Sequence, residues 1–285
     1  MNFLLGFVVV IGCVLGGFVI SGGHPLALWH PSELLVIFGA AMGAFIISNP
    51  IKIIKKVGGN FGILFKGSKY TKALYLDALA LMYDLLNKAR KDGMVALEAD
   101  VDEPENSAIF QKYPNVTANH HALDFICDYL RLMVSAKLNS FEIEALMDVE
   151  LDTHHEEGHA PPAAINRIAD GLPGFGIVAA VLGIVITMAS LNDGAEVIGH
   201  KVATALVGTF LGILLAYGFV GPIANYLDYA AKDESQFIKC LKTCLMASIQ
   251  GYPPQIAIEF GRKTIFSTER PGFRELDEHI KNNKS

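Results

Sequence analysis

The sequence predicts an all-α integral membrane protein with four transmembrane helices, a large helical domain between the second and third of them, and a helical C-terminal region. Apolar residues make up 52% of the 285 residues and charged residues only 18%, a more apolar balance than that of ordinary globular domains. Four windows of the chain lack Asp, Glu, Lys and Arg: residues 1–32, 34–51, 171–192 and 202–227. Crossing the hydrocarbon core takes about 17–25 helical residues, and each window is long enough to do so.

We expect the transmembrane helices at about residues 2–21, 33–49, 171–191 and 201–224. The first window resembles a signal peptide, but no Lys or Arg precedes its apolar core at 3–20, and this core is longer than that of a usual signal. A second apolar stretch follows after a short break. We therefore interpret the first window as a helix that is retained.

Lysine and arginine near the ends of the windows predict the orientation, because cytoplasmic loops carry an excess of them. Six lysines follow the second window: Lys52, Lys55, Lys56, Lys66, Lys69 and Lys72. The segment 24–33 has no Lys or Arg at all. We therefore expect a multi-pass membrane protein with both termini in the cytoplasm. The chain then divides into two membrane hairpins, 1–48 and 171–224, and two cytoplasmic regions, 49–170 and 225–285.

The first cytoplasmic region shows helical patterning in three places. Apolar residues recur at helical spacing in 70–90, 123–134 and 141–155. Gly93 predicts the end of the first of these helices, and Pro161 and Pro162 predict a break before the third membrane helix. The helix 141–155 is expected to present four apolar residues on one face: Ile143, Leu146, Met147 and Leu151.

The charge of this region changes along its length. Residues 49–91 hold nine Lys or Arg against two Asp or Glu, and residues 92–170 hold four against sixteen. The basic part fits a neighbouring lipid surface, whereas the acidic part is either a solvated face or a binding surface. The net charge of −6 gives no support to nucleic-acid binding. Cys240 and Cys244 are interpreted as buried small apolar residues, because the four cysteines do not fit a secreted disulfide framework.

The segment His155-Glu-Glu-Gly-His159 matches the HExxH motif of zinc proteases. That chemistry needs two histidines one turn apart on a stable helix, with the glutamate beside the metal. Gly158 weakens a helix here and Pro161 is expected to end it. We therefore interpret this segment, together with His154, as a solvated helix end, and we expect no metal, no other cofactor and no enzymatic activity.

Small residues at four-residue spacing occur in all four windows: Gly12/Gly16, Gly39/Gly43, Gly176/Ala180 and Gly208/Gly212. In lipid this spacing permits close approach of two helices. Its presence in every window predicts packing between chains in addition to packing within one chain.

No window carries an ionisable group at mid-depth, and Asp170 lies only at a window edge. Ion-coupled membrane proteins need such a group, so a partner must supply it if this chain conducts protons. Ala180 lies about 15 Å into its window from the cytoplasmic side, and Thr209 lies about 12 Å into its window from the outer side. The two residues are therefore at similar depth and are candidates for one shared pore. The alternative for Thr209 is a hydroxyl bonded to its own helix. Pro173 and Pro222 predict bends near the cytoplasmic ends.

Two segments of the membrane windows resemble the MotA family of flagellar motor stator subunits: Gly171-Leu-Pro-Gly-Phe-Gly-Ile-Val-Ala-Ala and Val207-Gly-Thr-Phe-Leu-Gly-Ile-Leu-Leu-Ala-Tyr-Gly. The resemblance extends over nearly the whole chain, through Ser68-Lys-Tyr-Thr-Lys-Ala, Phe141-Glu-Ile-Glu-Ala-Leu-Met-Asp, Gly251-Tyr-Pro-Pro and Glu259-Phe-Gly-Arg-Lys-Thr. It implies a homo-oligomeric ring, expected to hold five subunits, around two copies of the partner MotB. MotB would supply the proton-accepting Asp and a peptidoglycan anchor, and the ring would drive the rotor protein FliG.

The resemblance also implies roles for individual residues. Arg90 and Glu98 match charged positions of the torque interface with the rotor. The proton-coupling and pore positions are matched by Pro173, Pro222, Ala180, Thr209 and Asp170. Sodium-driven relatives carry Thr where Ala180 stands, so the transported ion is expected to be H⁺. Four charged residues have no secure equivalent in the family: Lys91, Asp92, Asp102 and Lys201.

Two other functions stay open from the sequence. An ExbB- or TolQ-like energiser of an envelope complex uses the same principle of a ring and a partner, but those relatives have three membrane helices. A self-contained transporter would need its own membrane carboxylate or a polar site at mid-depth, and the windows carry neither.

Overall fold

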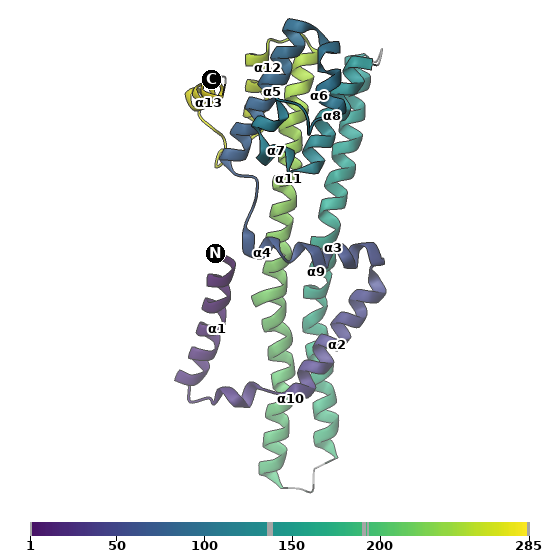
Figure 1. Cartoon of the computed structure of the whole chain (residues 1–285). Helices are drawn as coiled ribbons and strands as arrows, with labels where there is room; N and C mark the ends of the chain where they lie inside the picture. The colour runs from purple at the N-terminus through teal and green to yellow at the C-terminus, as the bar shows by residue number, and fades with distance from the viewer. Residues whose placement is uncertain (1, 136–138, 190–191, 193, 284–285) are drawn as a thin grey trace. The chain divides into compact units, whose positions relative to one another are not determined.

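The computed structural model describes residues 2–135, 139–189, 192 and 194–283, and over these residues every regular element is a helix (Figure 1). The chain divides into two compact units. The membrane unit comprises residues 1–67 and 157–230, and the polar unit comprises residues 68–156 and 231–285. Four helices in the described chain are long and apolar enough to cross a membrane, as the four charge-free windows predict.

The membrane unit contains α1 (Asn2–Ile20), the short 3₁₀-helix η1 (Pro25–Leu28), α2 (Pro31–Ser48), α3 (Ile51–Asn60), α4 (Ile63–Lys66) and α10 (Ala195–Leu215). It also contains the second part of α9 (Ser140–Met188). Helix α3 is amphipathic, with Lys52, Lys55 and Lys56 exposed and Val57 buried. Such a helix suits the boundary between lipid and water, where lysines meet anionic headgroups.

Pro161 and Pro162 do not break the chain before the third membrane helix. Both lie inside α9, which runs without interruption from Ser140 to Met188, and both are buried. An interior proline costs a helix about 3 kcal/mol. Tertiary packing offsets that cost here, because the next turn buries Ala164 and Ile165 against neighbouring helices. The predicted break was therefore wrong.

The fourth membrane helix continues into the C-terminal region. Helix α10 passes through a π-helical turn, η4 (Ala216–Val220), into α11 (Gly221–Ile249). The backbone N–H of Gly221 donates to the carbonyl of Ala216, five residues earlier. This widened turn directly precedes Pro222, whose ring would crowd the carbonyl four residues earlier in a regular helix.

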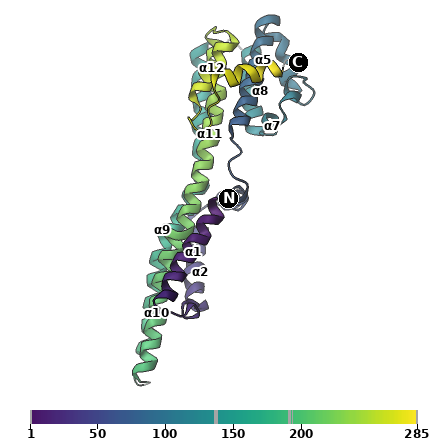
Figure 2. The same cartoon turned by 90° about the vertical axis from the view of Figure 1, so that its left-hand side faces the viewer.

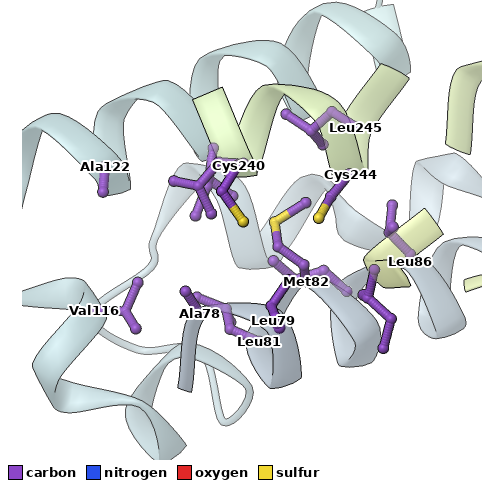
Figure 3. Packing of buried hydrophobic residues seen from close by; sticks show 14 of the residues in the cluster. Ala78, Leu79, Leu81, Met82, Leu86, Val116, Ala122, Cys240, Cys244 and Leu245 are labelled. Atoms are coloured by element: carbon purple, nitrogen blue, oxygen red, sulfur yellow. The ribbon is translucent and has the colours of Figure 1, made fainter. Parts of the chain in front are cut away.

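The polar unit is built from α5 (Lys72–Asp92), η2 (Met94–Leu97), α6 (Glu98–Asp102), η3 (Phe110–Lys112), α7 (Pro114–Thr117), α8 (His120–Ser135), α12 (Pro254–Thr264) and α13 (Phe273–Asn282), with the first part of α9 and the last part of α11. In its core Cys240 and Cys244 of α11 face Leu79 and Met82 of α5 (Figure 3). Both cysteines are buried and free, which confirms their interpretation as small apolar residues.

Local signals of the sequence explain the ends of several helices in the polar unit. Helix α5 stops before Gly93, whose positive φ of 89° favours glycine. Asn139 and Glu142 exchange hydrogen bonds at the start of α9, each backbone N–H donating over 2.9 Å to the other side chain. After α11, Gly251 donates to Ser248 and Tyr252 donates to Ala247, which closes the helix before the next one begins.

One predicted helix face needs correction. Ile143 and Met147 are buried and Leu151 packs against the core, but Leu146 is 44% exposed. Ile143, Met147 and Leu151 follow one another at intervals of four residues and form the buried stripe of the helix. Leu146 is three residues from Ile143, and in this helix that spacing turns it away from the stripe.

Candidate functional site

Helices α9 and α10 of the membrane unit run side by side (Figures 1 and 2) and meet along a seam of small residues. A Cβ on Gly176 would lie 2.8 Å from the carbonyl oxygen of Gly208. A Cβ on Gly212 would lie 2.7 Å from the carbonyl oxygen of Leu172 and 2.8 Å from Cα of Gly176. Contacts this short leave no room for a side chain, so the two backbones touch. The α9–α10 seam therefore uses the predicted small-residue spacing within one chain.

Ala180 and Thr209 lie at one level of this seam. A Cβ on Gly208, the residue before Thr209, would lie 3.2 Å from the backbone nitrogen of Ala180. Both Ala180 and Thr209 are half-buried. The hydroxyls of Thr187 and Thr204 donate to carbonyls of their own helices. Thr209 Oγ1 makes no such bond to any described residue, so the alternative of a back-bonded hydroxyl does not apply to it.

Asp170, Pro173 and Pro222 lie near the other end of the seam. Asp170 is exposed and accepts a hydrogen bond from Asn166 Nδ2 over 3.4 Å. Pro173 is half-buried and follows Leu172, whose carbonyl lies against Gly212. Gly221, the neighbour of Pro222, faces Ala169, with 4.0 Å between the Cβ of Ala169 and the position of a Cβ on Gly221. The structure thus brings the two prolines and Asp170 to adjoining turns of α9 and the η4–α11 junction.

The seam carries no carboxylate of its own. Between Asp170 and Met188 on α9, and between Glu196 and Leu215 on α10, the sequence has no Asp or Glu. Neither α9 nor α10 therefore supplies a carboxylate at the level of Ala180 and Thr209.

The glycines of α1 and α2 contrast with those of the seam. A Cβ on Gly12, Gly16, Gly39 or Gly43 would meet no atom within 4 Å. Helix α1 instead contacts the η4 turn through Phe7 and Phe219, whose ring centroids are 4.2 Å apart. The four glycines leave their close-approach surfaces open, which fits the prediction of packing between chains.

Arg90 and Glu98 lie on either side of the turn at Gly93 in the polar unit. Arg90 belongs to the last turn of α5 and Glu98 is the first residue of α6. Both are exposed, and neither forms an ion pair with another described residue. These two opposite charges are therefore available to a partner.

An ion pair that no sequence pattern predicted holds these two segments together. Lys88 Nζ of α5 donates to Asp100 of α6 over 2.5 Å, and Ser107 Oγ donates to the same carboxylate over 2.6 Å. Asp100 is only 8% exposed. Asp102, which has no secure family equivalent, pairs with Arg131 over 3.0 Å. The contacts join residues from different segments, so no local spacing could have revealed them.

The HExxH segment is helical, contrary to the prediction of a helix end. Residues 154–159 all lie inside α9. His155 Nδ1 is 3.2 Å from Ser235 Oγ, and His159 pairs with Asp228. His154 is half-buried, with its Nε2 3.7 Å from Glu234 Oε1, so its interpretation as part of a solvated end was wrong. The surrounding helices α8 and α11 cover it, which the sequence of α9 alone does not show.

Comparisons with known proteins match this architecture. A family model described as motility protein A N-terminal matches residues 4–93, and the model of the MotA/TolQ/ExbB proton channel family matches residues 118–239. Motility protein A of Salmonella typhimurium strain LT2 is 50% identical over 281 residues, which cover 99% of this chain and 95% of that protein. Chemotaxis protein LafT of Vibrio parahaemolyticus is 36% identical over 280 residues, with 98% of each chain covered.

Two solved structures share the fold. The structure of C. jejuni MotAB has a TM-score of 0.70 at 22% identity, covering 100% of this chain and 95% of that one. The flagellar MotAB stator complex from Bacillus subtilis has a TM-score of 0.69 at 24% identity, covering 90% and 92%. A helical membrane fold, the α9–α10 seam and a relative 50% identical over nearly the full length lead to one conclusion: the chain belongs to the motility protein A (MotA) family.

Proposed function

We propose that this chain is the stator subunit of a bacterial flagellar motor, which forms a proton-conducting complex with a MotB-type partner and converts proton flow into torque on the rotor protein FliG. Membership of the MotA family supports the stator role, and the match to the proton channel family supports the conducted ion. The two solved structures described above are MotAB complexes, which supports the partner.

One observation carries the mechanism: the seam holds Thr209 and Ala180 at one level and carries no carboxylate. A partner carboxylate at this level accepts a hydrogen bond from Thr209 when it is ionised and donates one when it is protonated. Because charge-assisted hydrogen bonds are stronger than neutral ones, protonation changes the preferred contact. Proton uptake would in this way shift the partner helix along the ring.

The residues at the level of Ala180 and Thr209 also favour protons over sodium as the conducted ion. A sodium pathway needs several oxygen atoms to replace the hydration shell, and the methyl group of Ala180 offers none. A proton needs only one carboxylate and a path of water. Swimming should therefore persist in sodium-depleted medium and stop when a protonophore is added.

Two prolines next to the seam are proposed to couple protonation to movement. Pro173 adjoins the Leu172 carbonyl that packs on Gly212, and Pro222 follows the widened turn at 216–220. Both features interrupt the regular backbone hydrogen bonding, so the helices bend there at lower cost. Pro173→Ala should leave assembly intact while slowing rotation. Normal swimming of that variant under load would contradict the hinge role.

The assembly is proposed to be a ring of five chains around two MotB-type partners in the inner membrane. The open glycine surfaces of α1 and α2 support contact with neighbouring chains. The lysines that follow α2, and the amphipathic helix α3 that carries three of them, support a cytoplasmic side there and cytoplasmic termini. Arg90 and Glu98 are proposed to meet FliG, because both are exposed and neither has a counter-ion among the described residues.

Reconstitution into proteoliposomes tests whether the partner, and not this chain, supplies the group that carries the proton. Proteoliposomes that contain this chain alone should not conduct protons, and those with the MotB-type partner should. A partner whose membrane Asp is replaced by Asn should assemble without conducting. Robust proton flux through the chain alone would overturn the proposal, because a carboxylate-free seam has no group to carry it.

An ExbB- or TolQ-like energiser remains the second candidate, since the MotA/TolQ/ExbB model covers both classes. Four candidate spans and the match to the MotA N-terminal model favour the stator. The chain expressed with its partner should restore swimming to a strain without a stator. Restoration of outer-membrane energisation without swimming would favour the second candidate.

A further inference from the structure

Three side chains from three helices of the polar unit meet at one point. They are His121 of α8, His154 of α9 and Glu234 of α11. One ring nitrogen of each histidine and one carboxylate oxygen of Glu234 lie within 4.8 Å of one another. The two imidazole rings are 5.1 Å apart between centroids and cross at 80°, and His154 Nε2 is 3.7 Å from Glu234 Oε1. No step of the proposed motor function uses these residues.

The chemistry of this set matches a divalent transition metal. Imidazole nitrogen suits zinc, copper and nickel, whereas magnesium and calcium prefer oxygen ligands alone. Two histidines and one glutamate form a known zinc ligand set that leaves the fourth tetrahedral position to water. Ligand atoms about 2.0–2.1 Å from a tetrahedral ion lie about 3.4 Å from one another. His121 is exposed, so its ring can turn by the small amount that this contraction requires.

A second layer of hydrogen bonds supports the carboxylate. Tyr70 is 5% exposed, and its hydroxyl accepts a hydrogen bond from Asn119 Nδ2 over 3.4 Å. Its hydroxyl is also hydrogen-bonded to Glu234, and in this bond the hydroxyl is the donor and the carboxylate the acceptor. Partners of this kind orient metal ligands, and their loss commonly weakens metal binding by about 10–100-fold.

We propose that His121, His154 and Glu234 bind one zinc ion, or a transition-metal ion of the same preferences, which joins α8 to α9 and α11. The set consists of two neutral imidazoles and one carboxylate, which lowers the net charge of the bound ion to +1. Helices α9 and α11 each have one part in the polar unit and one part in the membrane unit. The ion would therefore join α8 to two helices that continue into the membrane unit. Its expected effect is to stabilise the polar unit against unfolding.

Equilibrium dialysis against zinc alone tests the proposal. The full chain is purified with its MotB-type partner through an affinity tag without histidine, stripped with a chelator and dialysed against buffered zinc. One saturable zinc ion per chain is expected. His121→Ala and Glu234→Gln should each weaken zinc binding at least 10-fold, because each removes one ligand. His120→Ala is the matched control, since His120 is exposed, adjoins His121 on α8 and is not part of the cluster.

Cobalt substitution separates direct ligation from an effect on folding. His121→Cys keeps a ligand at an exposed position and should retain the ion, with a new thiolate-to-cobalt charge-transfer band in the near ultraviolet. His120→Cys should show no such band. Zinc binding of the His121→Ala and Glu234→Gln variants equal to that of His120→Ala would overturn the proposal. The same conclusion follows if the wild-type protein shows no saturable zinc or if His121→Cys gives no thiolate band.

Discussion

The two units of this chain both use glycine to bring helices together, but they are stabilised in different ways. In the membrane unit, Gly176 and Gly212 place the backbones of α9 and α10 in contact. In the polar unit, a Cβ on Gly261 of α12 would lie 3.0 Å from the carbonyl oxygen of Cys240 and would overlap the sulfur of Cys244. The polar unit adds ion pairs and a large cluster of buried side chains around this contact, whereas the seam buries few large side chains, among them Leu172, and has no ion pair among its described residues.

The difference follows from the solvent on each side. In lipid, burying an apolar side chain gains little, so helices associate through close van der Waals contact between small residues. In water, apolar burial contributes about 25 cal/mol per Å², and the polar unit buries Leu79, Leu81 and Met82 completely. Polar contacts add to this burial: Arg262 donates to both carboxylate oxygens of Glu259, one turn earlier in α12, at 2.6 Å, and to the carbonyl of Pro271 at 2.8 Å. Because the seam gains little from apolar burial and has no such ion pair among its described residues, we expect the packing of α9 on α10 to depend on each of its glycines.

The largest expected effect comes from filling the seam. Gly212→Val places two methyl groups against the Leu172 carbonyl and Gly176, and overpacking of this kind costs about 1–3 kcal/mol even where the structure can adjust. We expect loss of swimming together with a lower amount of assembled complex on native gels. Gly16→Val is the comparison variant, because a Cβ on Gly16 meets no atom of its own chain within 4 Å and the substitution therefore leaves the packing inside the chain unchanged.

Gly16→Val also tests what the open surface of α1 contacts. If Gly16→Val assembles and swims normally, the open surface of α1 faces lipid. If it folds but fails to form the ring, α1 packs on another chain. Normal swimming of Gly212→Val would contradict the dependence of the seam on its glycines.

A smaller effect is expected from the ion pair of the polar unit. Glu259→Gln leaves the guanidinium of Arg262, with a side chain only 9% exposed, without its charged acceptor. Loss of a buried partner of this kind costs about 1–3 kcal/mol. The thermal unfolding midpoint of the purified complex should fall, and Glu278→Gln, at an exposed position of α13, should leave it unchanged. Equal midpoints for both variants would show that large apolar side chains alone stabilise this unit.

The same pair predicts how stability depends on pH. The hydrogen bonds from Arg262 lower the pKa of Glu259 in the folded protein below its ordinary value of 4.5. The stabilisation is therefore complete above pH 4.5 and is lost as the pH falls through the lowered folded-state pKa. The difference in unfolding midpoint between wild type and Glu259→Gln should stay constant from pH 7 to 5 and narrow in more acidic buffer. A difference that persists unchanged to pH 2 would exclude ionisation as its cause.

The smallest effect is expected at the exposed charges of the polar unit. Surface ion pairs contribute about 0.2–1 kcal/mol each, so Arg90→Ala should slow swimming without abolishing it. Arg90→Glu should do more harm, and a compensating charge reversal on FliG should restore motion. Complete loss of swimming in Arg90→Ala, at normal protein level, would contradict a contact shared among several weak charges.

Sequence reasoning succeeded where neighbouring residues decide the structure. The charge-free windows predicted the four apolar helices, and Gly93 predicted the end of α5. It failed at Pro161 and Pro162, because packing outweighed the cost of an interior proline. It also missed Asp100, whose partner Lys88 belongs to another helix. The level shared by Ala180 and Thr209 was predicted from depth alone, but their contact surface was not.

By itself the sequence determined the helical membrane class, the apolar spans and the absence of a carboxylate inside the charge-free windows, because these depend on composition and on spacing along one segment. Only the tertiary structure decided which small residues pack inside the chain and which stay open, since Gly12/Gly16 and Gly208/Gly212 have the same spacing. It alone brought His121, His154 and Glu234 together. Contacts between distant segments depend on how helices pack on one another, and no local pattern records that packing.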